Sequence, residues 1–286
     1  MKLSNQTATK LSLLEQWFSK KEGSIVAFSG GIDSSLVLFL ARKFQGKEKA
    51  IGVISNSESL KKKDFQLAQE FCQWYDIRLE VIKTAELSDE RYYKNPIDRC
   101  FFCKEHLFHD LSSICDKYPG FEVLSGTNAD DLGDYRPGID AANKFKVLSP
   151  MVDCEITKEE LREIARYFEL PNWDKPASPC LSSRIPYNHI VTIEKLKQIE
   201  AAEDILNAYG FEDVRVRHYG DYGKIEVLHK DLNKLRIVEN EVVQKITALG
   251  FERCEIDKEG LVSGKMNRVI NQQADHARQN QQQQQQ

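Results

Sequence analysis

The sequence predicts an α/β protein: a parallel sheet with helices on both faces, followed by a small C-terminal α+β domain. Short apolar runs alternate with segments of helical periodicity over residues 7–168, a pattern typical of parallel sheets covered on both faces. Four prolines at 171, 176, 179 and 186 then interrupt regular structure. Beyond them the elements follow a different order, which indicates a second domain.

The elements of the first part follow from their periodicity. A helix is expected at 7–21, with Leu11, Leu14, Trp17 and Phe18 on one face. A later helix at 157–168 has Thr157 as its N-cap and Glu160 three residues on. Between them we expect strands at 25–28, 50–54, 79–82 and 122–125, and helices at 33–44, 58–75 and 104–117.

The second part is expected to combine helices with a hairpin. We predict helices at 192–209 and 231–249, strands at 213–218, 224–228 and 253–256, and a turn at 221–223. The predicted boundaries are 1–170 for the first domain, 171–190 for a linker that contains a cysteine, and 191–268 for the small domain. The glutamine-rich residues 269–286 are expected to be disordered.

A phosphate-binding loop is predicted between the first strand and the next helix. Glycines let several backbone N–H groups approach one anion, and the helix N-terminus adds partial positive charge. The segment lacks the GxxxxGK[ST] pattern, so it is not a Walker A loop and has no lysine of its own. Its candidate nucleotide-binding residues are Ser29, Gly30, Gly31, Asp33, Ser34 and Ser35.

Asp33 and residues near other strand ends complete the predicted pocket. A carboxylate beside phosphates implies an intervening Mg²⁺, or else a structural role in the turn. Asn56 and Ser57 follow the second strand and suit the adenosine side. Gly126 and Asp131 lie in a polar, glycine-rich segment beyond the fourth strand; Asp131 and its neighbour Asp130 fit metal contact or loop hydrogen bonding equally well.

Three cysteines suggest a metal site. Cys100 and Cys103 form a Cys-x-x-Cys pair, and Cys180 lies in the proline-rich segment. Three thiolates suit a [4Fe–4S] cluster with one open iron position, but they also suit zinc, with His106 or His109 as the fourth ligand. A redox-active pair is a third possibility, and the other four cysteines read as structural.

Paired arginines suggest an anion site in the second domain. Arg215 and Arg217 share one face of a strand, which suits phosphate or carboxylate binding, or a solvated face of ion pairs. Glu203 and Glu226 are either their ion-pair partners or a metal site. Arg184 beside Cys180 either holds a substrate phosphate or braces its loop.

The composition limits the class of protein. The chain has 286 residues, 41% hydrophobic and 29% charged, with a net charge of −4, so no overall basic field draws it to nucleic acid. The first ten residues lack the apolar segment of a signal peptide, and the apolar run at 36–41 is too short to cross a bilayer. We expect a cytoplasmic protein without membrane contact.

The loop SGGIDSS resembles the PP-loop of the ATP pyrophosphatase superfamily, whose fold is the adenine nucleotide alpha hydrolase type. With NSE at 56–58, DYRPG at 134–138, SSRIPY at 182–187, VRVR at 214–217 and SGKMN at 263–267, the chain resembles the LarE family. The resemblance covers about residues 24–267. It implies an ATP-dependent sulfur transferase that adenylates carboxylates of pyridinium-3,5-biscarboxylic acid mononucleotide and makes thiocarboxylates for the nickel-pincer cofactor of lactate racemase.

The resemblance also implies a sulfur strategy. In one branch of the family a loop cysteine gives up its own sulfur, and Pro179 stands at that position here, one residue before Cys180. The extra Cys100 and Cys103 resemble the three-cysteine branch, in which a [4Fe–4S] cluster carries sulfide. Asp33 and Cys180 are then the candidate catalytic residues, with ATP, Mg²⁺ and the cluster as cofactors.

Three other functions use the same loop. A tRNA thiolase would share the adenylation step, although the acidic composition argues against it. An amidating ligase of the NAD or GMP synthetase kind would use ammonia and would not need the cysteines. An ATP-binding regulatory domain would bind nucleotide without releasing pyrophosphate. The expected partners are a small nucleotide and a sulfur donor, and LarE relatives imply a homo-oligomer.

Overall fold

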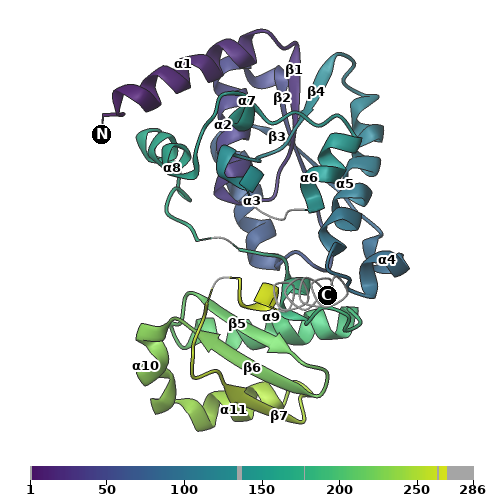
Figure 1. Cartoon of the computed structure of the whole chain (residues 1–286), viewed down its shortest axis with the longest axis vertical. Coiled ribbons are helices and arrows are strands. Elements are labelled where there is room, and N and C mark those ends of the chain that lie inside the picture. The colour runs from purple at the N-terminus through teal and green to yellow at the C-terminus, as the bar shows by residue number, and fades with distance from the viewer. Residues whose placement is uncertain (1, 134–136, 177, 263, 269–286) are drawn as a thin grey trace, which may run out of the picture. The chain divides into compact units, whose positions relative to one another are not determined.

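The computed structural model describes residues 2–133, 137–176, 178–262 and 264–268, and its contacts divide the chain into two units (Figure 1). The first comprises residues 1–86 and 98–179, and the second comprises 87–97 and 180–286. The segment 87–97 therefore packs with the second unit although it interrupts the first. Within the described residues, no helix is long and apolar enough to cross a membrane.

A four-stranded parallel sheet forms the centre of the first unit. Its order is β3 (Arg78–Ile82), β2 (Ala50–Ser55), β1 (Gly23–Ala27) and β4 (Phe121–Leu124). Ile25 lies opposite both Ile51 of β2 and Val123 of β4, so β1 is central. This arrangement confirms the predicted parallel sheet.

Helices cover both faces of this sheet, as alternate residues of β1 show. Val26 packs in one core with α1 (Asn5–Ser19), α2 (Ile32–Gln45), α3 (Lys62–Trp74), α7 (Pro150–Asp153) and α8 (Lys158–Tyr167). Ile25 and Ala27 pack in another core with α5 (Arg99–Cys115) and α6 (Pro137–Lys144). Both faces are therefore buried, which explains the unbroken apolar character of β1.

Several element boundaries differ from the expected ones. α3 begins four residues later than predicted, because residues 57–60 form a turn in which the Leu60 N–H donates to the Ser57 carbonyl. α5 begins five residues earlier, which brings Cys100 and Cys103 into its first turns. α6 was not predicted; its proline at the first position has a φ suited to a helix start.

The second unit contains a three-stranded sheet in the order β5 (Val214–His218), β6 (Tyr222–Val227), β7 (Arg253–Ile256). β5 and β6 form the predicted antiparallel hairpin, and β7 lies parallel to β6. α9 (Ile193–Ala208), α10 (Leu232–Ile237) and α11 (Glu239–Thr247) supply side chains to its core. The prediction of a single helix at 231–249 is thus wrong, because the helical segment is divided at Val238. The short α4 (Glu90–Tyr93), with Tyr92 fully buried, also belongs to this unit.

Some predicted features lie outside the described residues. These are the first three residues of DYRPG (134–136), the first residue of SGKMN (263) and the tail 269–286.

Candidate active site

Hydrogen bonds of its own serines fix the conformation of the loop between β1 and α2. Gly30 has φ +73°, a left-handed conformation that glycine adopts without the steric cost of a Cβ. The Ser34 hydroxyl accepts from the Ser29 N–H at 3.1 Å and donates to the Gly31 carbonyl at 3.1 Å. These bonds shape the turn while the first N–H groups of α2 have no partner within the helix. The loop therefore has the shape expected of an anion-binding site.

Two segments far along the chain support this loop. A Cβ on Gly126 would lie 2.6 Å from the Ser34 nitrogen, so only glycine allows the segment after β4 to approach α2 so closely. Asn172 donates to the Ser35 hydroxyl at 2.9 Å and to the Gly30 carbonyl at 3.3 Å. Gly126 was expected at the pocket, but Asn172 was not, because it carries no motif of its own.

Asp33 is held by two residues that sequence reasoning missed. Lys158 Nζ donates to the two carboxylate oxygens of Asp33, Oδ1 and Oδ2, at 2.5 and 2.6 Å. Asn128 Nδ2 donates to Oδ1 at 3.1 Å. The side chain of Asp33 is 32% exposed. The carboxylate thus faces a cation already, and its hard oxygen atoms also suit Mg²⁺.

The two aspartates after β4 make hydrogen bonds within this part of the site. Asp131, nearly buried, accepts from the Asn128 N–H at 3.0 Å. Asp130 accepts from the Lys158 N–H at 2.7 Å, so its carboxylate meets the positive end of α8. These contacts match the loop-bonding role that was one of the two expected for them.

The predicted adenosine side lies at the ends of β2 and β3. The Asn56 N–H donates to the Ile82 carbonyl at 2.9 Å, which extends the strand pairing, and its side chain is exposed. Ser57 is buried, with its hydroxyl 2.9 Å from that of Ser59. Ser59 in turn donates over 3.4 Å to the buried Glu86. Backbone and hydroxyl groups therefore gather at the edge of the sheet where the loop begins.

In the second unit, Arg184 forms a buried ion pair. Its Nε lies 2.8 Å from Glu203 Oε1 and its Nη2 lies 3.2 Å from Oε2, and the two side chains are 0% and 2% exposed. Arg184 Nη1 also donates to the Cys180 carbonyl at 3.0 Å and the Ser183 hydroxyl at 2.9 Å. This geometry braces the loop that carries Cys180.

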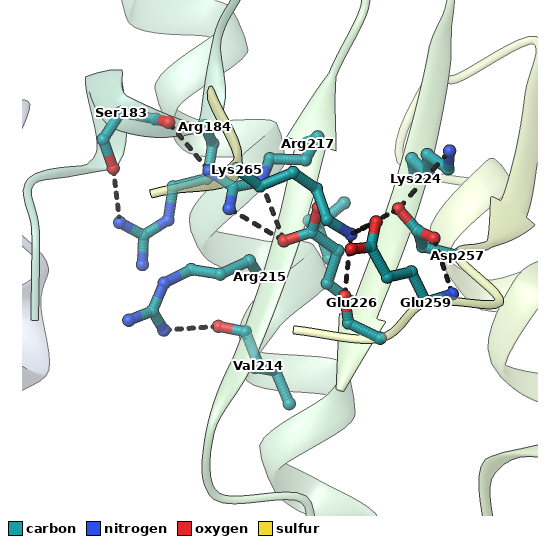
Figure 2. Close-up of polar contacts among 12 residues, drawn as sticks. Ser183, Arg184, Val214, Arg215, Arg217, Lys224, Glu226, Asp257, Glu259 and Lys265 are labelled. Carbon is teal, nitrogen blue, oxygen red and sulfur yellow. Dashed lines mark hydrogen bonds and ion pairs between the residues drawn. The ribbon is translucent and has the colours of Figure 1, made fainter. Parts of the chain in front are cut away.

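Arg217 makes a second such pair. Its Nε and Nη2 donate to Glu226 Oε2 at 3.0 and 2.8 Å, and its Nη1 donates to the Ser183 carbonyl at 2.9 Å (Figure 2). Lys265 Nζ lies 3.4 Å from the other oxygen of Glu226 and 2.8 Å from Asp257. Glu203 and Glu226 are thus ion-pair partners in the described residues, where no group of three or more potential ligands is placed to hold a metal.

Arg215 shares the face of β5 with Arg217 but lies in a more open position. It is half-buried and donates from Nη1 to the Val214 carbonyl at 2.7 Å. Burial, and then the positive charges of Arg184 and Arg217, lower the pKa of Arg215 to about 10. It remains charged at neutral pH, and a nearby anion would favour that charged form.

The cysteines fall into two groups. Burial raises the pKa of Cys72 and Cys254 to about 12 and that of Cys154 to about 11, and it also raises the pKa of Cys115. These thiols stay protonated and suit the structural role expected of them. Cys100 is exposed in the first turn of α5, Cys103 lies one turn later, and Cys180 is half-buried at the start of the second unit.

The fold and the loop define a class: a PP-loop enzyme that uses ATP. A family profile described as NAD synthase matches residues 11–97, which include this loop. A pyridinium-3,5-bisthiocarboxylic acid mononucleotide synthase of Lactiplantibacillus plantarum is 31% identical over 263 residues, 92% of this chain and 95% of the relative.

Two other relatives match over nearly their full length. Uncharacterised proteins of Synechocystis sp. and Methanocaldococcus jannaschii are 38% and 33% identical, over 92% and 87% of this chain and 98% and 94% of the relatives. The chain belongs to the family of the bisthiocarboxylic acid mononucleotide synthase, the LarE family, and is an ATP-dependent sulfurtransferase.

Proposed function

We propose that this protein adenylates the ring carboxylates of pyridinium-3,5-biscarboxylic acid mononucleotide and replaces one carboxylate oxygen with sulfur. The products would be thiocarboxylates for the nickel-pincer cofactor of lactate racemase. The observation that carries the proposal is the match over nearly the full length of a relative named for the bisthiocarboxylic product. The preformed phosphate loop supports the ATP-dependent half of the reaction.

The adenylation step assigns a role to the loop. A substrate carboxylate oxygen attacks the α-phosphorus of ATP, the bond to the β-phosphate oxygen breaks, and pyrophosphate leaves. The N–H groups at the start of α2, with Ser29 and Ser35, would bind the phosphates that become pyrophosphate. Mg²⁺ at Asp33 would neutralise the charge that accumulates there. A carboxylate becomes electrophilic in this way, because AMP is a good leaving group.

Arg215 is our candidate for the substrate anion. Arg184 and Arg217 each pair with a buried carboxylate, and Arg215 is half-buried beside them. A phosphate or ring carboxylate there would accept bidentate hydrogen bonds from Arg215 and favour its charged form. Arg184, Arg217, Glu203 and Glu226 would then position Arg215 and the loop at 180–184.

For the sulfur donor we propose a [4Fe–4S] cluster held by Cys100, Cys103 and Cys180. Cys100 and Cys103 are one turn apart, so they share a helix face, and the positive end of the α5 dipole favours an anionic ligand. Soft thiolates suit iron–sulfur ligation, and three of them leave one iron open. When bound, the cluster would supply sulfide, which attacks the acyl carbon as AMP leaves.

A defined assay tests the proposed function. Anaerobically purified protein is given Mg²⁺, ATP, sulfide and the biscarboxylic mononucleotide. We expect pyrophosphate and AMP, together with a product whose mass reflects sulfur in place of oxygen. Absence of pyrophosphate release with this acceptor would contradict the proposal. Ammonia in place of sulfide tests the amidating reaction favoured by the NAD synthase match, and tRNA as acceptor tests the thiolase reaction.

The cluster has its own test. Iron and acid-labile sulfide should each be present at about four per chain, as a [4Fe–4S] centre requires, and Cys180→Ala should lower both. Cys115→Ala, at a cysteine outside the proposed set, should leave them unchanged. Stoichiometric zinc without iron would replace the cluster by a Cys₃His site. The homo-oligomer implied by LarE relatives is checked by sedimentation of the same preparation.

Lysine replacements separate the two arginine roles. Arg215→Lys should lower kcat/KM about tenfold to a hundredfold, because Lys cannot make bidentate contacts, with little change in stability. Arg217→Lys should instead lower stability, because it loses buried contacts to Glu226 and the Ser183 carbonyl. Equal losses of stability in both variants would contradict the assignment of Arg215.

A further inference from the structure

Lys158 is an unusual first residue for a helix. α8 begins here, with Thr157 as its N-cap and Glu160 completing the capping box. The N-terminus of a helix carries partial positive charge, so a cation at this position is disfavoured by the macrodipole. Lys158 nevertheless points its ammonium at the phosphate loop, with Nζ 2.5 and 2.6 Å from the two carboxylate oxygens of Asp33. An arrangement that opposes the dipole indicates that the charge is needed at the loop.

The segment after β4 holds both members of this pair. Asn128 Nδ2 donates to Asp33 Oδ1 at 3.1 Å, and Asp130 Oδ2 accepts from the backbone N–H of Lys158 at 2.7 Å. The carboxylate and the helix start are therefore fixed by the same short segment. The flexible part is the four-carbon stem of Lys158, because its backbone is anchored and its side chain is 37% exposed.

The ammonium occupies the position that a metal ion would take on Asp33. Mg²⁺ bound there would use the same carboxylate oxygens, and two cations cannot share them at contact distance. The phosphate loop has no lysine of its own. A lysine that leaves Asp33 would be free to pair with the phosphate oxygens of a nucleotide bound at the loop. The Lys158 ammonium could thus pair with the Asp33 carboxylate first and with phosphate oxygens of the nucleotide afterwards.

We propose that Lys158 excludes metal from Asp33 until nucleotide arrives. Without ATP the ammonium pairs with Asp33; when Mg²⁺ enters bound to ATP, Asp33 passes to the metal and the ammonium moves to the phosphate oxygens. Lys158 is in this account a positioning residue that makes the metal bind with the nucleotide and not before it. The inference rests on the proposed magnesium at Asp33.

Metal titration without nucleotide tests this order. Mn²⁺, which replaces Mg²⁺ and is followed by its EPR signal, is added to the wild type, to Lys158→Met and to Asp33→Asn/Lys158→Met. We expect the single variant to bind Mn²⁺ about tenfold or more tightly than the wild type, since the competing charge is gone. The double variant should lose that gain. Equal Mn²⁺ affinity for the wild type and Lys158→Met overturns the proposal.

A matched control comes from the same unit. Lys175 pairs with Asp64 at 2.8 Å, so Lys175→Met also frees a carboxylate from a lysine. It should leave Mn²⁺ binding as in the wild type, and an equal gain would show that any freed carboxylate binds metal, which overturns the assignment. Lys158→Gln repeats the test with a polar side chain should the methionine variant fold poorly.

Nucleotide binding with Mg²⁺ present supplies a second readout. Under this condition Lys158→Met should bind ATP about tenfold more weakly than the wild type, because one charge-assisted contact to phosphate is lost. Unchanged ATP affinity would overturn the transfer of the ammonium to the phosphates. Both titrations omit the sulfur acceptor, so they succeed or fail independently of the proposed substrate; a wild type that never releases pyrophosphate would contradict the proposed function instead.

Discussion

Two ion pairs in this protein each engage both oxygens of a carboxylate, but in opposite surroundings. In the first unit, Lys158 meets both oxygens of Asp33, and the side chains are 37% and 32% exposed. In the second unit, Arg184 meets both oxygens of Glu203 with essentially no exposure. A partly exposed pair contributes little stability and exchanges partners readily, whereas a buried pair leaves a costly charge if one partner is removed. Burial, and not charge, therefore separates the ion pair at the β1–α2 loop from the ion pair that supports the cysteine loop.

The largest effect should come from breaking the buried pair. Glu203→Gln leaves the Arg184 guanidinium buried without a counter-charge, and we expect a loss of about 3–5 kcal/mol in unfolding free energy. Urea unfolding followed by circular dichroism measures it. Glu241→Gln removes a carboxylate from an exposed pair with Lys245 and should cost far less stability. Similar losses in both variants would contradict the contrast.

The next effect is pH dependence in the second unit. His218 is buried beside Gln198 Oε1, 2.9 Å from its Nε2. Burial, helped by the charges of Lys195 and His189, lowers the pKa of His218 to about 4. Between pH 6.5 and 4 the unfolded chain protonates His218 while the folded protein keeps the ring neutral. The free energy of unfolding is therefore highest above pH 6.5 and decreases as the pH falls toward 4.

The lost stability should reach about 3 kcal/mol, from the difference between the unfolded and folded pKa values. Unfolding free energies measured between pH 7.5 and 4 report it. His218→Gln keeps a polar side chain but does not titrate, so its curve should be flatter over that range. If the stability curves of the wild type and His218→Gln were parallel over this pH range, the pH dependence would come from other groups.

A third change tests how closely the first unit packs around its loop. Gly126→Ala places a Cβ 2.6 Å from the Ser34 nitrogen, so backbone must move at the phosphate site. We expect about 1–3 kcal/mol of lost stability and weaker ATP binding. Gly133→Ala is the control, because a Cβ there meets nothing within 4 Å. Calorimetric ATP titration of both variants decides whether the close approach matters.

The smallest effect concerns a single hydroxyl. Ser34→Ala removes the acceptor of the Ser29 N–H and the donor to the Gly31 carbonyl. We expect about 1 kcal/mol of lost stability and a severalfold higher KM for ATP, since the loop loses its preformed shape. Ser113→Ala on α5, where the exposed hydroxyl bonds only to its own helix turn, should leave that KM unchanged. An unchanged KM in Ser34→Ala would show that the glycines alone shape the loop.

Local signals explain what the sequence predicted well. The capping residues Thr157 and Glu160, the apolar strands and the glycine turn all act through neighbours in the chain, and the structure confirms them. The helix starts at α3 and α5 were misplaced because turns and caps compete there with apolar periodicity. The break at Val238 was missed because the apolar pattern continues through it.

Long-range contacts explain what the sequence concealed. Lys158, Asn128 and Asn172 meet the phosphate loop only after the sheet has formed, and each residue looks ordinary within its own segment. The pairing of Arg184 with Glu203 also depends on a loop meeting a distant helix. Both residues were predicted as site residues, but their pairing with each other was not. Of these residues, only Lys158 carried a local signal in the sequence. It directly follows the Thr157 N-cap, a position at which a cation is disfavoured.

The chain passes between its two units three times, and this restricts how it can be dissected. Residues 87–97 leave the first unit, and within the second the Tyr92 hydroxyl lies 2.7 Å from that of Ser182 while Asn95 donates to the Ile185 carbonyl. A fragment ending at Pro179 would retain this segment without its partners and expose an otherwise covered tyrosine. Separate production of the first unit therefore requires removal of 87–97 and a new junction between Glu86 and Asp98, and the second unit must be given that segment as an added peptide.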